Sequence, residues 1–132
     1  MGEISKLTLV NLVSKIKSKE ISAVDACSEY VNRIVKSKKL NSFVTETLEQ
    51  AISSAKKIDD NNLKEGILSG APIAVKDLFC TKNVETTASS KILKGFVPTY
   101  ESTITSKLWD SGAVLLGKLN CDEFAMGSSN ET

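Results

Sequence analysis

The side chain best placed to do chemistry in this sequence is Lys76, which follows a short apolar run at residues 73–75. An unbroken apolar run between turn residues is typical of a strand buried on both faces, and Pro72 is tolerated at the start of a strand. Open α/β sheets bind ligands at the carboxyl ends of their strands, where Lys76 would lie. Two interpretations stay open: Lys76 is functional, or its amine reaches water along its own aliphatic stem.

Three other groups of residues carry weaker signals. Gly127-Ser128-Ser129 could form an anion-binding or nucleophile turn, but no G-x-S-x-G elbow surrounds it. Asp122 and Glu123 could be paired acids, although adjacent side chains diverge on a helix, so a solvated first helical turn is the simpler interpretation. Cys80 would be reactive only as a thiolate, and nothing around it in the sequence establishes that state.

The composition excludes several classes of function. Seventeen basic and sixteen acidic residues leave a net charge of +1, so no overall field indicates a nucleic-acid or membrane partner. The three cysteines lack C-x-x-C spacing, which favours reduced thiols in a cytosolic protein over disulfides or a zinc site. The absence of histidine excludes Ser-His-Asp and Cys-His catalysis. No apolar run approaches the ~18 residues of a membrane span, and residues 1–6 contain no signal-peptide core.

The spacing of apolar residues predicts a single α/β domain within these 132 residues. Strands are predicted near residues 41–46, at 73–75 and at 113–116. Helices are predicted from Leu9, from Ser22 as an N-cap, across 48–58, and from Ser102 to the stop at Gly112. The helical stripes include Leu9 and Ile104 as buried residues.

The second and third strands should form a right-handed β-helix-β unit and so a parallel pair. Their ends would present Lys76-Asp77 beside Lys118-Leu119-Asn120. The connection at 78–100 is long, and loops of that length in compact domains are usually functional or cover a site. We therefore expect any site to lie at this edge of the sheet.

Four ordered blocks of the sequence resemble the amidase-signature family, and the resemblance extends over essentially the whole chain. The blocks are Gly70-Ala71-Pro72-Ile73-Ala74-Val75-Lys76-Asp77, Thr86-Thr87-Ala88-Ser89, Gly112-Ala113-Val114-Leu115-Leu116-Gly117-Lys118 and Asp122-Glu123-Phe124-Ala125-Met126-Gly127-Ser128-Ser129. Within the family, the last block with Asn130-Glu131-Thr132 is most similar to the A subunits of glutamyl-tRNA(Gln)/aspartyl-tRNA(Asn) amidotransferases.

The resemblance implies the amino-terminal part of the amidase-signature fold, with a mixed sheet covered by helices and incomplete here. It divides the chain into a helical amino-terminal region at about 1–65 and the start of the catalytic α/β core at about 66–132. The chain is therefore expected to be an amino-terminal fragment.

The family uses a Ser–cis-Ser–Lys triad, which needs no histidine, and its catalytic lysine falls on Lys76. Both serines belong to a Gly-Gly-Ser-Ser-Gly-Gly-Ser signature that these residues do not contain, and Ser128 and Ser129 do not replace them. Met126, Gly127 and Ser128 are expected beside the substrate channel. A lysine acts as a base only when neutral, and burial disfavours the ammonium, so Lys76 should be buried in the full-length protein. Adjacent strand residues face opposite sides, so Asp77 need not approach its amine.

The implied function is glutaminase activity within a ligase of protein biosynthesis. Ammonia released from glutamine passes to Glu-tRNA(Gln) or Asp-tRNA(Asn) activated by ATP on the B subunit, while the C subunit completes a cytoplasmic heterotrimer. ATP and magnesium act on the partner, and no cofactor or metal is expected in this chain, which alone should be inactive. Two alternatives stay open: a fragment of a stand-alone amidase for a small amide, or a non-catalytic remnant that still binds a partner.

Overall fold

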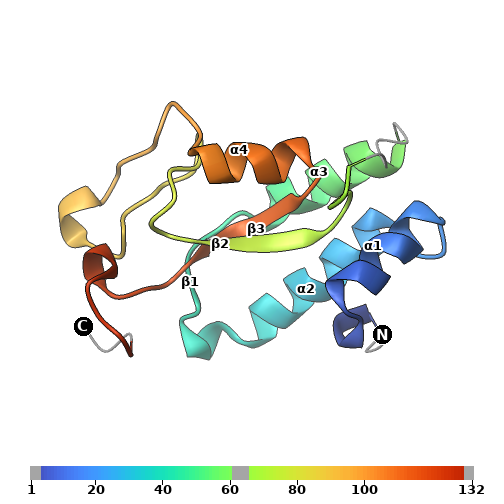
Figure 1. Ribbon diagram of the computed structural model, residues 1–132. Coiled ribbons are helices and arrows are strands. Elements are labelled where there is room, and N and C mark those ends of the chain that lie inside the picture. Colours follow the sequence, from blue (N-terminus) through green and yellow to red (C-terminus); the bar gives the residue numbers. More distant parts are fainter. Residues whose placement is uncertain (1–3, 61–65, 130–132) are drawn as a thin grey trace.

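The computed structural model describes residues 4–60 and 66–129. The described chain forms a three-stranded sheet with helices on both faces (Figure 1). Its elements, in order, are η1 (Ile4–Lys6), α1 (Leu9–Lys17), α2 (Ala23–Lys36), η2 (Lys38–Leu40), β1 (Phe43–Glu46), α3 (Leu48–Asp60), β2 (Pro72–Lys76), η3 (Lys91–Leu93), α4 (Thr103–Asp110), β3 (Val114–Leu119) and η4 (Glu123–Ala125), where η marks a 3-10 helix.

The sheet has the strand order β1-β3-β2, so β3 lies in the centre. β3 runs antiparallel to β1 and parallel to β2, which confirms the predicted mixed sheet and the predicted parallel pair. β1 comes from the first 65 residues, so that region contributes one edge of the sheet as well as helices.

The two faces of the sheet are covered by different helices, with α4 on one side and α1, α2 and α3 on the other (Figure 1). The larger core lies on the three-helix side, where Val114 and Leu116 of β3 meet the buried helix residues Leu12, Ile16, Ala23, Ala26, Cys27, Ala51, Ala55 and Ile58. The smaller core lies on the α4 side and joins Val75, Val84 and Leu115 to the partly buried side chains of Leu108 and Trp109. Burial of these side chains stabilises the layers by roughly 1.5–3 kcal/mol for each large apolar residue.

The predicted helix ends are confirmed by the observed caps. Ser22 accepts a hydrogen bond from the Asp25 amide at 2.9 Å, and Ser102 accepts one from the Thr105 amide at 3.2 Å, as N-cap residues do. Gly112 follows α4 with φ +87°, the left-handed conformation that glycine adopts after a helix without a steric cost.

Two predicted core residues are wrong. Leu9 is 49% exposed, because it lies in the first turn of α1 beside an open groove against Ile67 and Leu68. Ile104 is 53% exposed, because the inward face of the short helix α4 is occupied by Thr105 at that level. Thr105 is fully buried and donates to the carbonyl of Cys80, so its neighbour is directed outward.

The long connection between β2 and α4 is ordered by local contacts. It contains an isolated bridge between Thr81 and Val84 and the 3-10 helix η3. Its central residues 86–90, called the clamp loop below, are mostly buried. No helix among the described residues is both long and apolar enough to cross a bilayer.

Candidate active site at the carboxyl ends of β2 and β3

Lys76 is the last residue of β2, and the structure leaves its side chain exposed. It pairs with Leu119 of β3, and the next amide, that of Asp77, donates to the Leu119 carbonyl at 2.9 Å. The strand therefore ends as predicted, with a lysine at the carboxyl edge of the sheet. The burial expected for Lys76 concerns the full-length protein and stays a prediction. Among the described residues, the charged groups buried at this edge are Asp77 and Lys118.

Asp77 and Lys118 form a completely enclosed ion pair. Both side chains are 0% exposed, and Nζ of Lys118 lies 3.4 Å from Oδ1 of Asp77. The same Nζ donates to the Phe79 carbonyl at 2.8 Å and to Oγ1 of Thr86 at 2.6 Å. An ammonium has three donors, and two of them make hydrogen bonds here, while Oδ1 of Asp77 makes an ionic contact without a hydrogen bond.

Two opposing effects act on the amine of Lys118. Burial lowers its pKa from the ordinary lysine value, because a desolvated ammonium is disfavoured, while the Asp77 carboxylate beside it acts in the opposite direction. Isolated buried charges cost far more than paired ones, so removal of either residue would leave its partner uncompensated in the core.

A β-bulge explains why Lys118 faces this side of the sheet. Ile73 pairs with Leu115 and Ala74 with Gly117, so β3 carries one extra residue at this point. Leu115 and Lys118 are three residues apart and would lie on opposite faces of a regular strand. The bulge instead brings Lys118 level with Val75 and away from the three-helix core. Glycine within an apolar strand is a known sign of a bulge, and this was the sequence signal for the buried lysine.

The carboxylate of Asp77 also holds the clamp loop. Its Oδ2 accepts hydrogen bonds from the Thr87 amide at 3.0 Å, the Thr87 hydroxyl at 2.6 Å and the Ser89 amide at 3.3 Å. Its backbone carbonyl accepts from the Ala88 amide at 2.9 Å. Ala88 and Ser89 have φ values of +50° and +53°, which non-glycine residues adopt at a cost of about 1–3 kcal/mol unless their surroundings enforce it.

The clamp loop in turn binds residues 120–126, called the tail segment below. The Ala88 carbonyl accepts from the Phe124 amide at 2.9 Å. The Ser89 hydroxyl oxygen accepts from the Cys121 amide at 3.1 Å. The Ser90 hydroxyl donates to Oε1 of Glu123 at 2.5 Å. A chain of contacts therefore connects the end of β2 with the segment that leads to Met126.

The predicted channel residues lie at the surface. Met126 is 75% exposed, and Gly127 and Ser128 are exposed as well. A side chain at Gly127 would meet Cγ of Asp122 at 2.5 Å, so the turn there requires a residue without a Cβ. Asp122 precedes the short segment η4, in which Phe124 and Ala125 have the left-handed φ values of 51° and 58°. The predicted first turn of a regular helix is therefore wrong at this position. Asn130-Glu131-Thr132, part of the last sequence block, lies outside the described residues.

The structure brings together a different set of polar residues from the one the sequence singled out. Gly127-Ser128-Ser129 follows η4 as an exposed turn, whereas Asp77, Thr87 and Lys118 form a buried cluster. The sequence predicted that Asp77 and Lys118 would lie side by side at the strand ends, and their ion pair agrees with this. It did not predict that both side chains are buried or that Thr87 joins them. In residues 4–60 and 66–129, no group of three or more His, Cys, Asp or Glu side chains could hold a metal ion.

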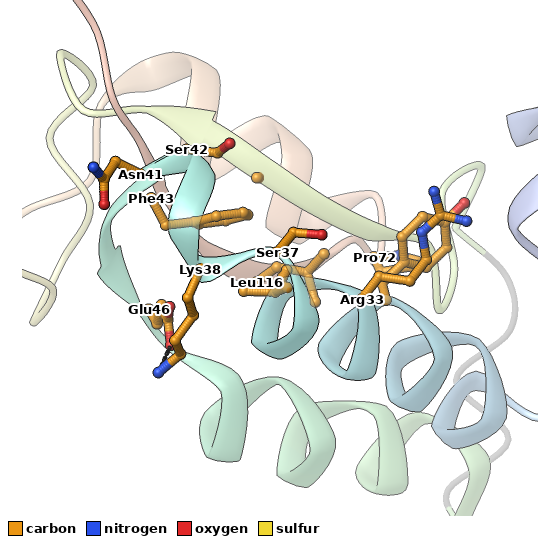
Figure 2. Close-up of a pocket in the computed structure, with 12 residues that line it drawn as sticks. Arg33, Ser37, Lys38, Asn41, Ser42, Phe43, Glu46, Pro72 and Leu116 are labelled. Carbon is orange, nitrogen blue, oxygen red and sulfur yellow. Dashed lines mark ion pairs between the residues drawn. The ribbon is translucent and has the colours of Figure 1, made fainter.

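A separate groove of about 640 Å³ lies on the three-helix side of the sheet. Figure 2 shows the ring of Phe43 reaching into it, with Leu116 below and the Lys38–Glu46 ion pair, 3.4 Å long, at the rim. Pro72 and Ala74 of β2 also line it. The groove does not include the clamp loop or the tail segment, and we assign it no chemistry.

The fold places this chain in a known class of proteins. Residues 25–132 match the family model described as Amidase, and the chain belongs to that family. This confirms the resemblance carried by the four sequence blocks, which fall in the same range.

The curated relatives narrow the similarity further. The A subunit of the glutamyl-tRNA(Gln) amidotransferase of Pelagibacter ubique (strain HTCC1062) is 54% identical over 132 residues, which is 100% of this chain and 27% of that protein. Its counterpart in Hyphomonas neptunium (strain ATCC 15444) is 51% identical over 134 aligned residues, again 100% of this chain and 27% of that protein. The chain thus spans 27% of the length of these relatives and corresponds to their amino-terminal part.

Solved structures share the fold. A native peptide amidase from Stenotrophomonas maltophilia superimposes with a TM-score of 0.85 at 25% identity, covering 97% of this chain and 27% of that chain. A fatty acid amide hydrolase gives a TM-score of 0.87 over 94% of this chain and 23% of that chain, and its 22% identity speaks to the fold alone. The amino-terminal part of the amidase-signature fold is therefore confirmed.

Proposed function

We propose that this chain contributes the catalytic lysine, Lys76, to the amide-hydrolysing component of a glutamyl-tRNA(Gln)/aspartyl-tRNA(Asn) amidotransferase. The observation that carries the proposal is the position of Lys76 at the carboxyl end of a parallel strand, with an exposed amine. The match to the amidase family and the 54% identity to a relative named as an amidotransferase A subunit support it.

In the proposed mechanism Lys76 acts as a general base in its neutral form. Its amine accepts a proton from the bridging serine, which accepts one from the nucleophilic serine, and that oxygen attacks the side-chain amide carbon of glutamine. The carbon–nitrogen bond breaks, the leaving nitrogen takes up a proton, and ammonia departs. Water then cleaves the acyl-serine ester, so glutamine and water become glutamate and ammonia. The two serines belong to parts of the protein outside these 132 residues.

The exposed turn at Met126, Gly127 and Ser128 is the proposed border of the substrate channel. The tail segment is hydrogen-bonded to the clamp loop, and the clamp loop is hydrogen-bonded to Asp77 at the end of β2. These contacts support a location of the turn near Lys76. Exposed apolar side chains such as Met126 are common at binding surfaces, since the flexible thioether adapts to different contacts.

The proposed assembly has three kinds of subunit. The relatives are A subunits of an amidotransferase by name, which supports a multi-subunit complex. We propose the B and C subunits as the partners, glutamine as the substrate of the component that contains this chain, and charged tRNA as the substrate of the complex through the B subunit. ATP and magnesium would act on that partner. Work on charged tRNA implies a cytoplasmic location.

The proposal is tested by measuring ammonia released from glutamine by the full-length protein that carries this segment, with and without the B and C subunits. We expect release that depends on Lys76 and on the partners. Hydrolysis of small amides but not of glutamine would instead favour a stand-alone amidase, the second candidate, which the similarity to a peptide amidase supports. No hydrolysis of either substrate would overturn both.

A further inference from the structure

We infer that Asp77 and Lys118 are positioning residues that hold Lys76 and the Met126–Ser128 turn in one fixed spatial relation. The inference rests on the proposed function, which makes these two segments walls of one active site. Neither residue needs to touch substrate, because both act through the clamp loop. Four sets of contacts, described in order from the end of β2 to the tail segment, support this inference.

The first set fixes the end of β2. Asp77 follows Lys76 directly, and its amide continues the ladder to Leu119 at 2.9 Å. Because its carboxylate is also fixed, the backbone that carries Lys76 is held on both sides of the peptide. The backbone at Lys76 therefore cannot move without disturbing the buried pair.

The second set concerns the charge. Both side chains of the pair are 0% exposed, and Lys118 places its ammonium 3.4 Å from Oδ1 of Asp77. The same ammonium donates hydrogen bonds to Phe79 and Thr86. Lys118 therefore supplies the opposite charge that the buried carboxylate needs, while Oδ2 of Asp77 serves the clamp loop as acceptor.

The third set is that binding. Three donors from Thr87 and Ser89 meet one carboxylate oxygen, and they enforce the left-handed conformations of Ala88 and Ser89. Two consecutive non-glycine residues in this conformation persist only when the surroundings determine them, and such strain concentrates at functional sites. The clamp loop is thus shaped by Asp77 and not by its own propensity.

The fourth set transfers this shape to the tail segment. Ala88 binds Phe124, Ser89 binds Cys121 and Ser90 binds Glu123. Asp77 therefore contacts Lys76 through one peptide bond and reaches the Met126–Ser128 turn through the clamp loop. The pair lies between the two segments and couples them.

The coupling is tested by amide hydrogen exchange on the full-length protein. Asp77→Asn removes the charge, and Thr87→Val removes only the 2.6 Å hydroxyl donor, so it serves if the first variant does not fold. We expect each to raise exchange of the Phe124 amide by about tenfold, the factor set by losing one hydrogen bond to a charged group. In Thr87→Val, which keeps the buried pair, the amides of α2 and α3 should be unchanged. Unchanged Phe124 exchange in both variants, or an equal rise throughout α2 and α3 in Thr87→Val, would overturn the inference.

Enzyme kinetics distinguish the contact between Asp77 and the clamp loop from the contact between the clamp loop and the tail segment. Ser90→Ala cuts the link to Glu123 and leaves Asp77 intact, so we expect KM to rise about threefold to tenfold with kcat retained. Thr87→Val should lower kcat as well, since it loosens the side next to Lys76. Lys38→Met, which breaks an exposed pair of the same 3.4 Å length, should change neither constant. Identical kcat and KM in wild type and Thr87→Val would overturn the inference.

The outcome also separates this inference from the proposed function. If the wild-type protein hydrolyses no amide, the proposed function fails, and the exchange of Phe124 still shows whether Asp77 couples the two segments. If the wild-type protein is active but Phe124 is unaffected by Asp77→Asn and Thr87→Val, the positioning inference alone fails.

Discussion

Lys76 and Asp77 are neighbours in the chain, yet the first is exposed at the end of β2 and the second is fully buried on the α4 side of the sheet. A carboxylate next to a lysine ordinarily favours the ammonium and so opposes the role of a base. Here the carboxylate is directed toward Lys118, 3.4 Å away, and not toward Lys76. The alternation of a strand thus separates the proposed base from its acidic neighbour.

Replacement of Lys76 tests the proposed base. In the full-length protein, Lys76→Ala and Lys76→Arg should each lower kcat for amide hydrolysis by about 10²–10⁴, the usual contribution of a general base. Arginine fails because a guanidinium does not deprotonate. Lys82→Arg, another exposed lysine in the following connection, is the matched control and should keep full activity. Near-normal ammonia release by Lys76→Arg would rule out the base.

The stability of the buried pair can be measured by a double-mutant cycle in denaturant. Lys118→Met alone should lower the free energy of unfolding by about 3–5 kcal/mol, because it leaves the Asp77 carboxylate buried without its partner. Asp77→Asn combined with Lys118→Met should recover much of that loss, since no buried charge remains. The exposed pair is the control: Lys38→Met should cost no more than about 1 kcal/mol. A cost that small for Lys118→Met would contradict the buried pair.

The raised pKa of the Cys27 thiol predicts that the folded protein loses stability at high pH. Burial, and secondarily the charge of Asp59, raise its pKa from 9.0 to about 12. The folded state therefore keeps the proton while the unfolded state loses it, and stability is fully present below pH 9 and falls as the pH rises toward 12. One unit above the unfolded pKa, at about pH 10, the loss is about 1.4 kcal/mol.

Comparison with a variant isolates this effect from the other groups that titrate at high pH. In Cys27→Ala the extra loss of stability between about pH 8 and about pH 10 should disappear, while the contributions of lysines and tyrosines remain. Equal pH dependence in the two proteins would show that the thiol does not titrate in this way. Denaturant unfolding followed at several pH values measures it.

Gly117 is predicted to be intolerant of any side chain. It has φ +152° within the bulge, and an added Cβ would collide with the carbonyl of Thr45 and lie 2.9 Å from Cδ1 of Phe43. Gly117→Ala should therefore weaken the pairing of β1 with β3 and cost about 1–3 kcal/mol or more. Gly95→Ala provides the control, because Gly95 also has positive φ, at +85°, but meets nothing within 4 Å. Equal thermal shifts in both variants would mean that strain alone, without the clash, explains the effect.

Local signals in the chain were sufficient for most of the architecture. The apolar spacing and the N-cap serines at Ser22 and Ser102 predict helices whose observed starts agree, because caps and periodicity act within a few residues. The short apolar runs and the helix between them predict the parallel β2–β3 pair for the same reason. The end of the apolar run at 73–75 also predicted that Lys76 lies at the carboxyl end of a strand, as it does in β2.

Only the tertiary structure showed that Lys118 is buried. The bulge at Gly117 shifts β3 by one residue and directs Lys118 toward Asp77. Faces of a strand invert with a one-residue shift, so a local pattern read as regular assigns such side chains to the wrong side. The compensating carboxylate comes from a position 41 residues away. Its contact depends on how two strands and the clamp loop pack together, which no short stretch of sequence encodes.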